Sequence, residues 1–123
     1  MSTDDHNAGQ QRQFYRAEVD FSVTLRVAGE DSSESARAHD LSGGGMRVSM
    51  ERHLDRGQPV ELRFHLPGGT SEVGVRGLVV LSFYEGSTAH YHHGVAFTSI
   101  GQADREAIVH YIHDVQRRSL KGH

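Results

Sequence analysis

The sequence contains no cysteine, no run of about 18 apolar residues and no excess of positive charge. Without cysteine the chain cannot form disulfides or zinc–thiolate sites, which fits a cytosolic protein. Without a long apolar run it has no candidate membrane helix, and its polar, acidic N-terminus does not resemble a signal peptide. A formal net charge of −3 excludes the broad basic field that drives binding to long nucleic acids. We therefore expect a cytoplasmic protein.

Recognisable catalytic motifs are also missing. The sequence has no GxSxG, HExxH or P-loop pattern and no suggestive pair of carboxylates, so we predict that the protein is not an enzyme. Ten histidines raise the alternative of a metal site, with His90 and His92 alternating on one strand and His110 and His113 sharing a helix face. No cysteine or acidic residue follows at a signature spacing. We predict solvent-facing histidines and no metal site.

The composition and length indicate one globular domain. The chain has 123 residues, of which 36% are hydrophobic and 24% charged, as is typical of a folded protein. Residues 1–11 are polar and show no periodicity, so we expect a flexible N-terminal tail there. The predicted domain covers residues 12–119, and residues 120–123 form a short C-terminal tail.

Alternation of apolar and polar residues predicts several strands. The pattern is clearest from Val19 to Val27, where every second residue is apolar. Gly77 lies in phase with the apolar residues of a later strand and indicates a bulge or a close backbone approach. Turn-forming residues separate the runs. The six predicted strands cover 19–27, 35–41, 46–50, 60–66, 73–83 and 91–97.

The period changes near the C-terminus. Ile108, Tyr111, Ile112 and Val115 follow the spacing of an amphipathic helix, predicted over about 102–119. A capping box is expected between Ser99 and Gln102 at its start. Six strands with hairpin-length connections and one helix indicate a mainly β fold. We predict a six-stranded antiparallel β-barrel whose C-terminal α-helix closes one end with its apolar face.

A first motif precedes the first strand. Arg12 and Arg16 enclose Gln-Phe-Tyr, placing two guanidinium groups four residues apart where no apolar pattern requires them. Guanidinium groups bind phosphate, and the acceptor-rich edge of guanine, with two parallel hydrogen bonds. Phe14 and Tyr15 could stack on a base. Taken alone, two surface arginines beside a strand explain the pattern equally well.

A second motif follows the second predicted strand. Asp40-Leu-Ser-Gly-Gly-Gly45 supplies a carboxylate, a hydroxyl and exposed peptide N–H groups. Asp, Ser and Gly are also ordinary turn residues, but three consecutive glycines exceed the needs of a short hairpin. Such a loop can bind an anion through its backbone N–H groups. The carboxylate of Asp40 can accept hydrogen bonds from the N–H groups of guanine.

Together these motifs resemble the PilZ domain family, whose receptors bind the bacterial second messenger cyclic di-GMP. That family carries RxxxR before its first strand and [D/N]xSxxG between its second and third strands. Here the motifs read RQFYR and DLSGGG, in the same order and the same places. The resemblance covers about residues 10–118 and implies a PilZ-type six-stranded barrel with a C-terminal helix.

The resemblance also implies roles for individual residues. Arg12 and Arg16 would bind phosphate and the Hoogsteen edge of guanine, Asp40 and Ser42 would contact base and phosphate, and Gly45 would keep the loop close to the ligand. Further ligand contacts are expected at Gln11, Gly43 and Gly44. Many family members have arginine where this chain has Gln11, a position that bears on whether one or two ligand molecules bind.

We therefore interpret the chain as a stand-alone cyclic di-GMP receptor without a cofactor. Ligand-induced ordering of residues 1–16 across the barrel would signal to an unidentified protein of the motility, adhesion or exopolysaccharide machinery. Three alternatives remain: a PilZ-fold adaptor that ignores nucleotide, a single-stranded nucleic acid binder, and an enzyme acting on cyclic dinucleotides. The 7% aromatic content and the negative charge disfavour the nucleic acid binder.

Overall fold

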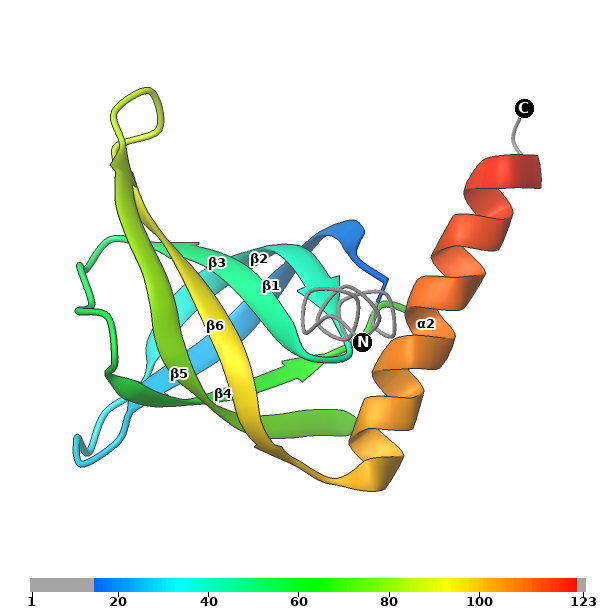
Figure 1. The fold of residues 1–123 in the computed structure, drawn as a ribbon, viewed down its shortest axis with the longest axis horizontal. Helices are drawn as coiled ribbons and strands as arrows, with labels where there is room; N and C mark the ends of the chain where they lie inside the picture. Colours follow the sequence, from blue (N-terminus) through cyan, green and yellow to red (C-terminus); the bar gives the residue numbers. More distant parts are fainter. Residues whose placement is uncertain (1–14, 122–123) are drawn as a thin grey trace, which may run out of the picture.

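The computed structural model describes residues 15–121, and side chains as far as residue 118. Six antiparallel strands close into a barrel in the order β1-β2-β3-β6-β5-β4, with one helix after them (Figure 1). This confirms the predicted fold class. The elements are β1 (Ala17–Val27), β2 (Glu34–Ser42), β3 (Gly45–Met50), β4 (Pro59–His65), β5 (Glu72–Glu85), β6 (His90–Ile100) and α2 (Gln102–Lys121).

The strand alternation sends one set of side chains into the barrel. In β1, for example, Phe21, Val23, Leu25 and Val27 are buried while the residues between them face outward. Leu41, Val48, Val60, Leu62 and Val79 from the other strands join them in one continuous core. A period of two therefore separates the apolar interior from a polar exterior all around the barrel.

A bulge in β2 changes which of its residues face outward. The pairing with β3 shifts between Ala38 and Asp40, so that Ala38 pairs with Val48 but Asp40 pairs with Arg47. Ala38 and Leu41 are both buried, whereas His39 and Asp40 between them are only partly buried. The extra residue thus places two consecutive polar side chains on the outer surface.

Gly77 confirms the prediction of a bulge and a close approach. A Cβ atom on Gly77 would lie 2.5 Å from the carbonyl oxygen of Ala96 and 2.6 Å from Cγ1 of Val95. The β5–β6 register shifts between Arg76 and Gly77, and again between Val79 and Leu81. The β5–β6 hairpin extends beyond the barrel (Figure 1).

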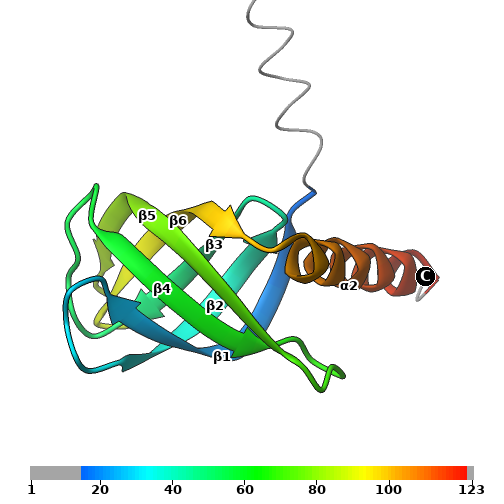
Figure 2. The same cartoon turned by 90° about the horizontal axis from the view of Figure 1, so that it is seen from below.

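The helix crosses one end of the barrel and then extends away from it (Figures 1 and 2). Ile108 and Ile112 are buried in the core, and Tyr111 and Val115 pack beside them, as the helical periodicity predicts. The predicted capping box is wrong. Ser99 still belongs to β6, and the N–H of Arg105 donates to the carbonyl of Gly101, which makes Gly101 the N-cap. No helix within residues 15–121 is long and apolar enough to span a bilayer.

Candidate nucleotide-binding site

The Ser42–Gly45 turn is held by its own serine. Ser42 is buried, and its hydroxyl oxygen accepts from the N–H of Gly44 at 3.2 Å and donates to the carbonyl of Gly45 at 3.4 Å. Ser42 also pairs with Gly45 in the β2–β3 register, which makes this a two-residue hairpin. The hydroxyl that sequence reasoning assigns to ligand therefore stabilises the turn itself.

Two neighbouring elements fix the same turn from outside. The carbonyl of Gly43 accepts a hydrogen bond from Nε of Arg105 in α2 at 3.2 Å. The carbonyl of Gly44 accepts one from the N–H of Phe97 in β6 at 2.9 Å. Because the carbonyls point to α2 and β6, the turn is attached to the barrel before any ligand binds.

Gly45 is required by the barrel wall. A Cβ atom at this position would lie 2.6 Å from the carbonyl oxygen of Val95, which belongs to the backbone of β6 and cannot move aside easily. Close approach of β3 to β6 thus explains the glycine without reference to a ligand. The role predicted for Gly45, keeping the loop near the ligand, stays a prediction.

A surface groove of about 570 Å³ lies over this turn. Its lining includes Arg16 from the segment before β1 together with Asp40, Ser42, Gly44 and Gly45 from the second motif. The groove volume falls within the range of about 300–1,000 Å³ typical of small-molecule sites. The fold therefore brings an arginine of the first motif and the second motif into one concave surface.

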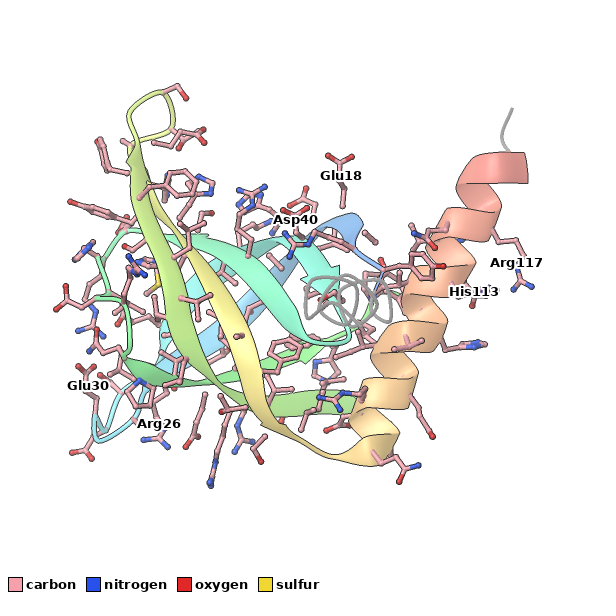
Figure 3. The ribbon with its side chains drawn as sticks, viewed as in Figure 1. Glu18, Arg26, Glu30, Asp40, His113 and Arg117 are labelled. Atoms are coloured by element: carbon pink, nitrogen blue, oxygen red, sulfur yellow. The ribbon has the colours of Figure 1, made fainter. Side chains whose placement is uncertain are left out.

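The polar wall of the groove is an ion pair. Nε of Arg47 donates to Oδ2 of Asp40 at 2.8 Å, and both side chains are largely but not fully buried, with 31% and 19% exposed. Figure 3 shows Asp40 on the outer side of the barrel. A carboxylate held on one oxygen can still accept hydrogen bonds on the other, so Asp40 keeps the capacity to bind guanine.

The opposite wall of the groove is apolar. Val80 and Leu81 of β5 line it with 51% and 49% of their surface exposed. Both face outward because of the register shift between Val79 and Leu81. Gly94 lies opposite Leu81 in β6, and a Cβ atom there would be 3.2 Å from Cβ of Leu81. A flat base could pack on this wall while its polar edges face Arg16 and Asp40.

The sequence matches the PilZ domain family model over residues 10–114. The chain belongs to the PilZ family. A search of curated protein sequences finds no match.

Solved structures show the same PilZ fold. The Bacillus subtilis inhibitor of motility MotI/DgrA gives a TM-score of 0.75 at 19% identity, covering 89% of this chain. The chain spans only about half of that protein, 52% of its length. The PilZ domain of CeSA from a cellulose-synthesizing bacterium gives a TM-score of 0.61 at 17% identity, covering 83% of this chain and 98% of that one. The PilZ domain of Escherichia coli YcgR, solved with c-di-GMP, gives a TM-score of 0.62 at 15% identity, covering 92% of this chain and 97% of that one.

The structure places the PilZ motif residues as follows. Arg16, Asp40, Ser42, Gly44 and Gly45 line the groove, and Gly43 lies in the turn below it. Arg12 and Gln11 lie outside the described residues, so their predicted contacts stay predictions. Within the described side chains, no three His, Asp or Glu residues could hold a metal ion together.

Sequence reasoning missed Arg47 and His92. Nη1 of Arg47 lies 2.8 Å from Nδ1 of His92, which is only 4% exposed and stacks on Phe83 with ring centroids 5.1 Å apart. The prediction of solvent-facing histidines is therefore wrong for His92, and also for the fully buried His93. The available signal was Arg47 itself, a charged residue on the outward face of the strand that follows the second motif.

Electrostatics in this region keep the histidines neutral. Burial lowers the pKa of His92 below its ordinary value, and Glu85, whose Oε1 lies 3.4 Å from Nε2, opposes that shift. Burial also lowers the pKa of His39, with a further lowering from Arg47. Neutral imidazoles beside Arg47 add no positive charge to that of its guanidinium.

Proposed function

We propose that this PilZ protein is a receptor for cyclic di-GMP. The observation that carries the proposal is the position of Arg16, which lines the same groove as Asp40 and Ser42 although 24 or more residues separate it from them. Cyclic di-GMP presents two phosphates and two guanines, which need cations, carboxylate acceptors and a flat apolar surface. The groove offers each of these. The YcgR relative solved with c-di-GMP supports the same ligand.

Each wall of the groove can contact a different part of the ligand. The guanidinium of Arg16 can form paired hydrogen bonds with a phosphate or with O6 and N7 of guanine. Asp40 can accept from the N–H groups on the other edge of the base. Val80 and Leu81 provide the apolar contact. Arg12 and Gln11, from the segment before Arg16, would complete the site.

The proposed mechanism is signalling without catalysis. Binding orders residues 1–16 across the barrel, and a downstream protein of the motility, adhesion or exopolysaccharide machinery reads the changed surface in the bacterial cytoplasm. Because the turn is already attached through Arg105 and Phe97, the ordering of the segment that carries Arg12 and Arg16 is the main conformational step.

Isothermal titration with cyclic di-GMP tests the proposal, with GMP and cyclic GMP as ligand controls. We expect saturable binding of cyclic di-GMP only. Arg16→Ala should weaken it about 10- to 100-fold, because a hydrogen bond to a charged group contributes about 1.5–3 kcal/mol. Arg63→Ala is the matched control, since Arg63 is an exposed arginine of β4 paired with Glu72 and outside the groove. Equal affinities for the two variants would contradict the assignment of Arg16.

A nucleotide-independent adaptor is the second candidate. It is favoured by the large apolar side chains exposed on the outer face of β5, which can contact a protein partner. These are Leu78, Val80, Leu81, Phe83 and Tyr84. No binding of cyclic di-GMP to the wild-type protein, in titration and in an independent equilibrium dialysis, would favour this adaptor over the receptor.

A further inference from the structure

Arg47 joins two acceptors in neighbouring strands. Its Nε donates to Oδ2 of Asp40 in β2, and its Nη1 lies 2.8 Å from Nδ1 of His92 in β6. The register explains the contact, since Arg47 pairs directly with Asp40 of β2, and Ser49, two residues further along β3 on the same face, pairs with His92 of β6. One planar guanidinium therefore connects the groove to a buried imidazole.

The contact determines the protonation of His92. An arginine can only donate hydrogen bonds, so Nδ1 of His92 must accept and the imidazole carries its proton on Nε2. Nε2 faces Oε1 of Glu85 in β5 at 3.4 Å, which suits an N–H at that position. Stacking on Phe83 holds the ring in this orientation. Contacts at both ring nitrogens and at one ring face therefore fix the orientation of His92.

From this geometry we propose that Arg47 is a positioning residue for nucleotide binding, held in place by neutral His92 and holding the Asp40 carboxylate toward the groove. The proposal rests on the proposed function. It predicts that Arg47 contributes to affinity through the orientation of Asp40, and that the contribution requires an accepting nitrogen or oxygen at the position of Nδ1 in residue 92.

Protonation of His92 should break its hydrogen bond with Arg47. A proton on Nδ1 would place two donors and two positive charges face to face, so the hydrogen bond from Arg47 could no longer form. The charged and titratable groups facing His92 are Glu85 from β5, Arg47 from β3, His39 from β2 and His90 from its own strand. Only Glu85 favours the protonated ring. Affinity should therefore be constant above the ordinary histidine range and fall below it.

The experiment is a titration of the full chain with cyclic di-GMP at pH about 7.5 and pH about 5. At the higher pH, Arg47→Ala should bind about tenfold more weakly than wild type. Arg47→Lys should recover part of that loss, because it keeps one charged donor for Asp40. At the lower pH, wild-type affinity should fall toward that of Arg47→Ala and no further.

His92→Asn separates positioning from a general structural effect. Asparagine offers a carbonyl oxygen near the position of Nδ1 and does not titrate, so this variant should bind equally well at both pH values. His39→Asn is the matched control, because the ring of His39 lies 5.3 Å from that of His92, while its Nε2 pairs with Oγ of Ser49 and not with Arg47. It should keep the wild-type pH dependence. A pH dependence unchanged in His92→Asn would overturn the proposal.

A ligand-free measurement on the wild-type protein keeps the proposal testable if a variant fails to fold. Long-range ¹H–¹⁵N spectra of the wild-type protein at neutral pH report the tautomer of His92. A proton on Nε2 supports the proposal, and a proton on Nδ1 overturns it. The two proposals fail differently: wild-type protein that does not bind cyclic di-GMP at pH about 7.5 refutes the receptor function. Wild-type protein that binds, with Arg47→Ala equal to it, refutes only the positioning role.

Discussion

Two adjacent histidines of β6 lie in opposite regions of the molecule. His93 points into the barrel, is 0% exposed, and accepts a hydrogen bond on Nε2 from the N–H of Leu54 at 2.9 Å. His92 points to the outer side of the barrel beside the groove, where it contacts Arg47 and faces Glu85. Successive strand residues face opposite sides, so one histidine belongs to the core and the other to the outer surface beside the candidate site.

The interior and the outer surface should differ in whether their residues contribute to stability or to ligand binding. Inside the barrel, His93 is fully buried, all six strands contribute apolar side chains to the core, and a change there removes packing. On the outer side, His92 contacts Arg47, which lines the groove, and faces Glu85, so we expect a change there to affect the proposed ligand site. Interior substitutions should therefore lower the free energy of unfolding with little effect on affinity, and groove substitutions should do the reverse.

The largest expected effect is at the centre of the interior. Leu62 is 0% exposed, so Leu62→Ala should lower the free energy of unfolding by about 2–5 kcal/mol through lost packing and a residual cavity. Urea denaturation measures this loss of stability. The adjacent outward residue gives the control, since Arg63→Ala should change stability by less than about 1 kcal/mol. Equal losses for both would contradict the division into interior and exterior.

His93 should make the interior sensitive to acid. Burial lowers its pKa from 6.5 to about 4, so the folded state favours the neutral ring. Stability from this group is fully present above pH about 6.5 and is lost as the pH falls toward 4, in total about 3 kcal/mol.

His93→Gln tests the source of that loss, because glutamine can still accept from the N–H of Leu54 but does not titrate. The difference in unfolding free energy between pH about 7 and pH about 4.5 should be smaller in the variant. Some acid sensitivity should remain, since His39 and His92 also have lowered pKa values. An unchanged difference would show that His93 is not its main source.

Gly45 lies where the two regions meet. Gly45→Ala should destabilise the protein by about 1–3 kcal/mol, because the new methyl group would lie 2.6 Å from the Val95 carbonyl oxygen. It should also weaken cyclic di-GMP binding, since β3 must shift beneath the groove. Gly74→Ala in β5 is the control, with nothing within 4 Å of the added atom. Thermal unfolding and titration on both variants would show whether this one position affects both properties.

The smallest expected change in stability is at the edge of the groove. Arg16 is exposed and precedes β1, so Arg16→Ala should alter the free energy of unfolding by less than about 0.5 kcal/mol while reducing affinity as described above. Thermal unfolding without ligand measures this. A large loss of stability with unchanged affinity would assign Arg16 to the fold and not to the site.

Local sequence pattern was sufficient for most of the fold. The alternation in β1, the helical spacing of Ile108 and Ile112, and the in-phase Gly77 each depend on residues close together in the chain. Both PilZ motifs could likewise be read directly. The exception was the capping box, where Ser99 remained in β6 because pairing with Arg76 extends that strand to Ile100.

The connections around the site were decided only by the tertiary structure. The bulge that sends His39 and Asp40 outward together, the contact of Arg47 with His92, and the burial of His92 and His93 all depend on register between strands. A period of two shows that residues share a face, but not which residues of another strand lie beside them. Barrel closure supplies that information, because it brings β3 against β6, 45 residues apart at the Arg47–His92 contact.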